Sequence, residues 1–325
     1  MSTITALASG SKMSLNLRRY PYWLAGAVFI ALFSINVCLQ PRFIEWGSIQ
    51  SNLTTYLPLI ILTTGQTYVV LGGSVDLSIG AIVSLVNVVG VRSIEYLGGS
   101  PTAILEGIGL SLAVGLGAGF LNGIAVGLLR LQPIVATFAT SIVFSGLALY
   151  VMPQAGGTLP DSYFQTYSGS ILWLPVPLLI LIVTLVATTL VSKSRFYTYL
   201  LATGGNGQAA FQTGLPIKTI RVQSHVIAGL AAAATSLCIL GETGSGDPLL
   251  GPAFTLSTVS GVVLGGTALS GGFGSITGSV LGAATLGLIN SLIFFSKLPY
   301  YLQPLVQGVI LLAALAGGVF VSRKQ

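Results

Sequence analysis

The chain has 325 residues, of which 53% are hydrophobic and only 6% are charged, and its mean hydropathy is +0.90. Because a soluble domain carries about 25% charged residues, these proportions exclude a soluble enzyme, a nucleic-acid-binding protein and a disordered chain. We interpret the net charge of +6 as an orientation signal in a membrane protein.

Apolar segments long enough to cross a bilayer, about 20 residues each, recur along the whole sequence. We expect an all-α polytopic membrane bundle of about ten helices. It forms one transmembrane domain over residues 1–325, with a cytoplasmic tail at 1–21. The expected spans are 22–40, 53–72, 78–97, 102–129, 132–152, 171–192, 222–241, 253–269, 275–296 and 300–321. Glycines within 69–80 and 262–274 predict broken helices in those two regions.

Basic residues are concentrated in three segments that a ten-span topology places on one side of the membrane. These segments are the N-terminal tail, the 193–221 loop and the C-terminus. The positive-inside rule makes that side the cytoplasm, so we expect both termini there. Arg42, Arg92 and Lys297 fall toward the opposite side and are the exceptions.

Glycines recur every four residues in two of the expected spans. Spacing by four places residues along one face of a helix, where small side chains let a second helix approach closely. We therefore expect helix packing at both faces. The glycines are Gly115, Gly119, Gly123 and Gly127 in the fourth span, and Gly274, Gly278 and Gly282 in the ninth.

A short polar segment with Gly72, Gly73, Asp76 and Ser78 separates the second span from the third. A carboxylate at the membrane centre costs about 2.5–3.5 kcal/mol on insertion scales and needs a partner or water. Non-helical backbone at that depth must be buried in protein or line a cavity. Two interpretations stay open: the start of a half-helix beside a transport path, or a cytoplasmic turn in which Asp76 caps the third span.

A second string, residues 262–274, shares the Val-Val-Leu-Gly-Gly core and a later Leu-Ser with the first. Asn122 and Asn290 also lie in glycine-rich spans of the two halves, in opposite expected orientations. These pairings indicate possible duplicated halves, a common build of transporters, but they imply different repeat handedness. Five polar residues in apolar spans either line a pathway or bond across helices: Gln66, Asn87, Asn122, Thr137 and Asn290.

The longest polar stretch between spans, residues 193–221, contains one predicted short helix within Thr203–Pro216. Asn206 is a good N-cap, Gly214 suits the position after the C-cap, and Pro216 prevents continuation. Such a capped helix, held out in the cytosol, could dock in a groove of a partner. The alternative is a helix that lies on the membrane surface.

None of the lysines follows a glycine, so the chain lacks the Gly-Lys-Ser/Thr sequence of a phosphate-binding P-loop. Cys38, Cys238 and His225 are the only cysteines and histidine, too few for a metal or haem site. We expect no cofactor in this chain, no enzymatic activity of its own, and energy from a separate subunit. The alternative function is a stand-alone channel or secondary carrier; an intramembrane enzyme is more remote because the carboxylates other than Asp76 lie near loops.

Four segments resemble the permease subunits of bacterial ABC importers of the ribose/monosaccharide type, which are related to branched-chain amino-acid permeases. The segments are Gly73–Gly80, Asn122-Gly123 with Pro133–Thr137, Gly204–Ala210 with Gly214-Leu215, and Val262–Gly274. The similarity extends from about Leu53 to Leu315.

The resemblance implies a bacterial inner-membrane protein in which two permease chains form the pathway. A cytoplasmic ABC ATPase would hold the ATP and Mg²⁺, and a periplasmic sugar-binding protein would deliver the solute. The resemblance favours a pathway role for Asp76 and Ser78. It implies that the ATPase docks at Gly205, Asn206, Ala209, Ala210 and Gly214.

Departures from the family pattern occur at Phe254–Ser257, where acidic residues are frequent, at Asn290-Ser291 and at His225. They leave open which sugar is carried. They also leave open whether the second permease is a copy of this chain or a different one.

Overall fold

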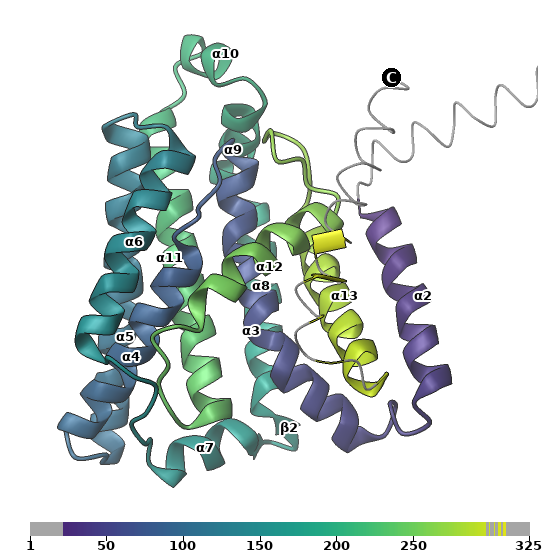
Figure 1. Ribbon diagram of the computed structural model, residues 1–325. Coiled ribbons are helices and arrows are strands. Elements are labelled where there is room, and N and C mark those ends of the chain that lie inside the picture. Colours follow the sequence, from purple (N-terminus) through teal and green to yellow (C-terminus); the bar gives the residue numbers. More distant parts are fainter. Residues whose placement is uncertain (1–21, 297–298, 300–301, 303–304, 307, 310–325) are drawn as a thin grey trace, which may run out of the picture.

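The computed structural model describes residues 22–296 together with 299, 302, 305, 306, 308 and 309. In this part the chain is an all-α bundle with one short β-hairpin. We name the two ends of the bundle after the elements found there: the α10 end, at the top of Figure 1, and the α7 end, at the bottom.

The elements are connected mostly by short loops. Their bounds are α2 Trp23–Leu39, α3 Trp46–Leu71, α4 Ile79–Tyr96, α5 Pro101–Gly123, the π-helical turn η1 Ile124–Leu128, α6 Pro133–Val151, α7 Asp161–Ser168, β1 Ser170–Ile171, β2 Leu174–Pro175, α8 Val176–Ser192, α9 Arg195–Gly205, α10 Gly207–Gln212, α11 Ile217–Thr243, α12 Gly251–Leu264 and α13 Ile276–Phe295.

Each of the first nine expected spans contains a helix. The tail at 1–21 lies outside the described residues, and so does most of the expected span 300–321. Within the described part, five helices are long and apolar enough to cross a membrane, and α8 with α9 makes a sixth if their 72° bend is one span. The protein is therefore a multi-pass membrane protein, and the number of about ten spans stays a prediction.

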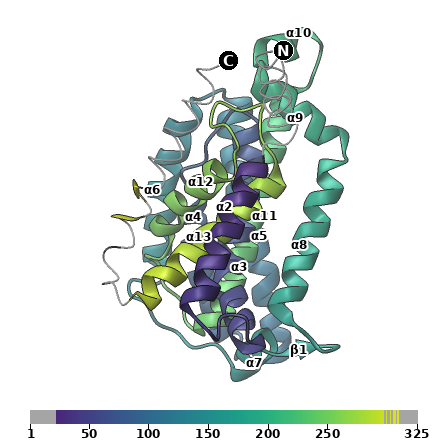
Figure 2. The same cartoon turned by 90° about the vertical axis from the view of Figure 1, so that its right-hand side faces the viewer.

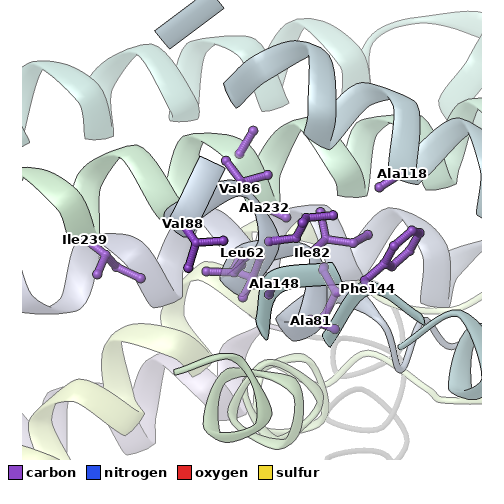
Figure 3. Packing of buried hydrophobic residues seen from close by; sticks show 14 of the residues in the cluster. Leu62, Ala81, Ile82, Val86, Val88, Ala118, Phe144, Ala148, Ala232 and Ile239 are labelled. Carbon is purple, nitrogen blue, oxygen red and sulfur yellow. The ribbon is translucent and has the colours of Figure 1, made fainter. Parts of the chain in front are cut away.

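Helix α3 occupies the centre of the bundle, and every residue from Leu57 to Leu71 is buried. It packs against α11, α12 and α13. Pro58 cannot donate a backbone hydrogen bond within α3, and its carbonyl oxygen accepts a bond from the Thr235 Oγ1 of α11 at 3.1 Å. The main apolar cluster joins α3, α4, α5, α6 and α11 (Figure 3). Helices α6 and α8 lie on opposite faces of the bundle (Figure 2).

The glycine ladder of α5 and η1 lies against α11. A methyl group at Gly115 would be 2.7 Å from the Ala233 Cβ, and one at Gly123 would be 2.8 Å from the Val222 Cα. Such contacts are too close for any side chain, so glycine sets the separation of the two backbones. Gly119 and Gly127 meet the backbone of α11 in the same way.

On α13 the ladder is shorter than the sequence predicted. Gly278 and Gly282 both meet the end of α12 at Gly265. Gly274 precedes α13 and has a φ of 142°, which an L side chain rarely adopts. Gly274 therefore belongs to the preceding loop and not to the packing face.

The two Val-Val-Leu-Gly-Gly segments form the same helix end. Gly73 has a φ of 78° and donates to the Val70 carbonyl at 2.9 Å, and Ser74 donates to the Val69 carbonyl at 3.1 Å. In the second copy, Gly266 has a φ of 81°, and the corresponding bonds to Val263 and Val262 are 2.9 and 3.2 Å long. Both are Schellman caps, which require a left-handed residue. The repeated motif thus encodes a helix stop, at the ends of α3 and α12.

The chain between α11 and α12 enters the bundle from the α7 end. The Asp247 N–H donates to the Asn87 Oδ1 at 2.8 Å, and the Gly251 N–H donates to the Ser84 Oγ at 2.9 Å. Asn87 and Ser84 lie about 13 and 18 Å along α4 from its end at Tyr96, at 1.5 Å per residue. Helix α12 therefore begins deep inside the bundle and has only 14 residues, so the expected span 253–269 is wrong beyond Leu264.

Three further elements differ from the sequence-based expectations. Helix α7 and the β1–β2 hairpin precede α8, whose start at Val176 is later than expected. The 193–221 loop is largely helical, because α9 directly follows α8. Residues 203–205 consequently end α9, and α10 is the short capped helix.

Candidate functional site

The link between α3 and α4, residues 72–78, is held by hydrogen bonds around Asp76. The Asp76 side chain is fully buried. Its Oδ1 accepts bonds from the Ser78 N–H at 2.8 Å and the Ser78 hydroxyl at 2.6 Å. The Asn122 Nδ2 donates to the Ser78 Oγ at 2.6 Å and lies 3.5 Å from the Asp76 Oδ2. Asp76 therefore holds the turn that precedes α4 and connects it to α5, whereas the N-cap residue of α4 is Ser78, without a side-chain cap bond.

Side chains of α3 and α6 complete this group. The Leu77 N–H donates to the Thr137 Oγ1 at 3.0 Å, and the Gln66 Nε2 donates to the Asp76 carbonyl oxygen at 3.2 Å. The Thr140 hydroxyl donates to the Asn122 Oδ1 at 2.7 Å. Sequence reasoning missed Thr140, although it follows Thr137 by three residues on the same helix. We call these residues the Asp76 cluster: Gln66, Asp76, Ser78, Asn122, Thr137 and Thr140.

The Asp76 cluster lies within the bundle near the α10 end. Thr137 is about 6 Å from the start of α6, and Asn122 is about 9 Å from the end of η1, at 1.5 Å per residue. In Figure 1 the link descends from the top of α3 before α4 begins. In the described part of the chain, the buried Gln66 Oε1 and Ser74 Oγ have no hydrogen-bond partner. The cluster thus holds non-helical backbone at depth and retains spare acceptor capacity.

The other two predicted lining residues lie elsewhere. Asn87 is buried in α4 and holds the entering chain before α12 through its Oδ1. Asn290 is half-buried on α13. The sequence alone does not separate these positions from those of the Asp76 cluster, because all of them are polar residues in apolar segments.

Helices α9 and α10 form an elbow that protrudes at the α10 end (Figure 1). Asn206 ends α9 and caps α10, because its Oδ1 accepts a bond from the Ala209 N–H at 3.0 Å. Gly214, with a φ of 80°, closes α10 through bonds to the Phe211 and Ala210 carbonyls from its own N–H and that of Leu215. The caps at Asn206 and Gly214 therefore occupy the predicted positions.

The outer surface of α10 differs from the expected one. Ala210 is only 5% exposed, whereas Phe211 is 66% exposed. Gln208 and Ala209 are also exposed. A partner of this helix would contact Ala209 and Phe211, and Ala210 would support α10 from beneath. A helix of six residues has too little periodicity to show this from sequence.

The charged residues at the two ends of the bundle differ. Lys193, Arg195, Lys218 and Arg221 lie around the elbow. At the α7 end, Arg42 pairs with Glu45 at 3.7 Å and Arg92 pairs with Glu95 at 3.1 Å. These two exceptions to the positive-inside pattern thus have acidic partners three residues away. Lys297, the third exception, lies outside the described residues.

An open groove at the α7 end has a volume of about 350 Å³ and lies between α3, α7 and the end of α11. The Glu242 Oε1 accepts a bond from the Thr55 hydroxyl at 3.0 Å on its wall. Burial, with a smaller contribution from the nearby Cys238, raises the pKa of Tyr167 well above its ordinary value. The groove therefore presents the Glu242 carboxylate, whereas the Tyr167 hydroxyl beside it is buried.

Apolar helices, helix breaks held by buried polar side chains, and a protruding capped elbow define a membrane transport protein. The chain belongs to the family of the permease component of the branched-chain amino acid transport system, which matches residues 48–315. It is therefore a subunit of an ABC transporter system.

Three curated relatives cover most of this chain. The ribose import permease protein of Bacillus subtilis is 31% identical over 92% of this chain and 91% of its own length. The L-arabinose ABC transporter permease protein of Azospirillum brasilense is 29% identical over 88% and 84%. The autoinducer 2 import system permease protein of Yersinia enterocolitica is 31% identical over 88% and 79%. No solved structure matches the chain significantly.

Proposed function

We propose that this chain is the transmembrane subunit of an ATP-driven importer, and that it moves a monosaccharide or related small polar solute across the bacterial inner membrane. The observation that carries the proposal is the similarity, over about nine-tenths of the chain, to permeases named for ribose and L-arabinose. The similarity to an autoinducer 2 permease keeps the substrate class wider than sugars alone.

In this proposal the elbow faces the cytoplasm and receives the ATPase, which holds ATP and Mg²⁺. Its basic residues support that orientation, since cytoplasmic loops are rich in lysine and arginine, and both termini would share that side. Phe211 supports the docking role, because exposed aromatic side chains are frequent anchors of interfaces. Asn206 and Gly214 would hold α10 in shape.

The solute would cross beside α12. In the segment before α12, Gly244, Ser245 and Asp247 are half-exposed, and backbone groups of all three are bonded within the chain. A second permease chain, either a copy or a different one, would cover this face and leave the pathway between the two chains. The start of α12 adjoins α4, because the Gly251 and Gly80 backbones are in contact. The Asp76 cluster would thus lie next to the pathway.

At the opposite side, the α7 end would receive a periplasmic solute-binding protein. The groove between α3 and α7 supports this assignment because it is open and its lining includes hydroxyl, amide and carboxylate side chains. A stand-alone channel or secondary carrier would need neither this protein nor an ATPase.

The docking role is tested with Phe211→Glu in the tagged full-length chain. Loss of an interface anchor costs about 2 kcal/mol or more, or about 30-fold in affinity, so we expect the ATPase to be lost on purification and uptake of labelled ribose or L-arabinose to fall. The matched control is Leu172→Glu, an 87% exposed apolar residue in the hairpin at the other end. It should retain the ATPase.

Two results would contradict the proposal. One is recovery of the ATPase with Phe211→Glu at the level of the unsubstituted chain. The other is accumulation of solute against its gradient by vesicles that contain this chain alone, which would favour the secondary carrier.

A further inference from the structure

Three glycine pairs from distant parts of the sequence meet at the α10 end. They are Gly72-Gly73 at the end of α3, Gly204-Gly205 at the end of α9, and Gly271-Gly272 in the loop between α12 and α13. We call this contact the glycine junction. It places the elbow directly against both of the helix breaks.

The junction is formed by backbone against backbone. A methyl group at Gly204 would overlap the Leu71 carbonyl oxygen and lie 2.6 Å from the Gly272 nitrogen. One at Gly271 would lie 2.6 Å from the Gly73 Cα. The Gly272 N–H also donates to the Leu71 carbonyl oxygen at 3.0 Å, which joins the two breaks. Gly73, Gly271 and Gly272 all have positive φ values. These positions therefore favour glycine for two reasons, the close backbone contact and the left-handed backbone conformation.

Such a contact has no flexible side chain that could absorb a displacement. When the elbow moves, the backbones at Leu71 and Gly272 must move with it or separate from it, since close-packed protein transmits strain. Long side chains, by contrast, could change rotamer and leave the breaks in place.

Each break positions the start of the next helix in the chain. Three residues after Gly73, Asp76 positions the start of α4 through Ser78. Three residues after Gly272, the Ser275 hydroxyl caps α13 by accepting a bond from the Gly278 N–H at 3.0 Å. A displacement at the glycine junction would therefore reach the starts of two helices within a few residues of chain.

We propose that Gly73, Gly204 and Gly271 are positioning residues for transport, which transmit the displacement of α10 to the Asp76 cluster and to the start of α13. The proposal rests on the proposed docking of the ATPase on α10. The junction makes no contact with solute; it couples the ATPase step to the rearrangement of the pathway.

The test compares Gly204→Ala with Gly117→Ala, a glycine of α5 that lies outside the junction and the elbow. A methyl group at Gly117 would have no atom within 4 Å, so Gly117→Ala is the matched control. Each is made in a background without Cys38 and Cys238, with a reporter cysteine in place of the half-buried Val75. The maleimide labelling rate of that cysteine is measured in the complex with the ATPase, with and without ATP and vanadate.

We expect ATP to change the labelling rate in the unsubstituted chain and in Gly117→Ala. In Gly204→Ala this change should be lost although the ATPase still copurifies and hydrolyses ATP. An unaltered ATP-dependent change in Gly204→Ala would overturn the proposal. Absence of the ATPase from the unsubstituted complex would instead contradict the proposed function, so the two failures are distinguishable.

A second measurement leaves the glycines intact and covers the case in which Gly204→Ala does not fold. Spin labels replace the exposed residues Gln208 on α10 and Phe273 beside the junction. A second pair joins Gln208 to Leu105 on α5. On ATP binding the first distance should stay constant while the second changes. A first distance that changes as much as the second would show that the elbow moves independently of the breaks, which overturns the proposal.

Discussion

The two oxygens of the Asp76 carboxyl have different partners. One accepts bonds from the Ser78 amide and hydroxyl, and the other faces Asn122 on a different helix. These bonds explain why a buried carboxyl is tolerated, because a buried polar group without partners would cost free energy. A role in the proposed pathway depends on what the second oxygen does.

Two substitutions separate these roles. Asp76→Asn keeps an oxygen for the Ser78 amide but replaces the other oxygen by a donor that faces the donor of Asn122. Asp76→Ala removes both oxygens, so the buried Ser78 amide loses its partner, at a cost of about 1–3 kcal/mol in the free energy of unfolding. We expect Asp76→Ala to lower both the melting temperature and uptake, and Asp76→Asn to lower uptake with a smaller loss of stability.

The control is Asp161→Ala, since Asp161 is exposed at the start of α7. Normal uptake by Asp76→Asn would restrict Asp76 to its role in the turn before α4. Retention of the ATPase by both Asp76 variants is expected, because no residue of the cluster belongs to α9 or α10.

At the scale of the elements, the contact between α5 and α11 depends on residue size. The ladder brings Gly119 of α5 and Gly229 of α11 into contact, where a methyl group at Gly119 would be 3.1 Å from the Gly229 Cα. Gly117, on another face of α5, has no atom within 4 Å of its would-be Cβ. Two glycines of one helix, separated by a single residue, thus differ completely in what a larger side chain would meet.

Gly119→Leu should therefore prevent accumulation of the folded protein, because overpacking costs about 1–3 kcal/mol even for added methylenes and here the obstacle is backbone. Gly117→Leu should accumulate normally. The yield and elution profile of fluorescent fusions in detergent provide the measurement. Equal yields of the two variants would remove the ladder from the interactions that hold the bundle together.

Sequence reasoning succeeded where the structure is determined by residues close together in the sequence. Asn206 and Gly214 cap α10 through their own side chain or backbone angle, and the apolar runs predicted the positions of most helices. It failed where the cause is tertiary. The glycine junction depends on segments far apart in sequence, and the depth at which α12 begins is set by Asn87 and Ser84 of another helix. Those two bonds cannot be inferred from a run of apolar residues that resembles an independent span.

For the Asp76 cluster the same division holds. Gln66, Asn122 and Thr137 stand out as polar residues in apolar segments, but only the folded chain brings them to one link. Asn87 and Asn290 have the same appearance in sequence and lie elsewhere.

At the scale of the whole molecule, the two ends of the bundle differ in charge and in shape. The elbow with its basic residues lies at one end, and the paired Arg42 and Arg92 lie at the other. The proposed topology places the elbow in the cytoplasm, with the β1–β2 hairpin on the periplasmic side.

Single cysteines test this orientation in a background without Cys38. A cysteine in place of Gln208 should react with a membrane-impermeant maleimide in inverted vesicles but not in intact spheroplasts. A cysteine in place of Leu172 should show the reverse. Labelling of the Gln208 position from outside would invert the proposed topology and remove the elbow as a docking site for a cytoplasmic ATPase.

The half-exposed residues before α12 have a consequence for the persistence of the protein in the cell. A permease chain without its companion would leave the polar residues Ser245 and Asp247 uncovered, which is the kind of defect that membrane proteases recognise in orphan subunits. Its abundance should then track that of the scarcer companion, and a pulse-chase experiment should find a shorter half-life when it is synthesised by itself. The same few residues that leave room for a solute would in this way also enforce the stoichiometry of the assembly.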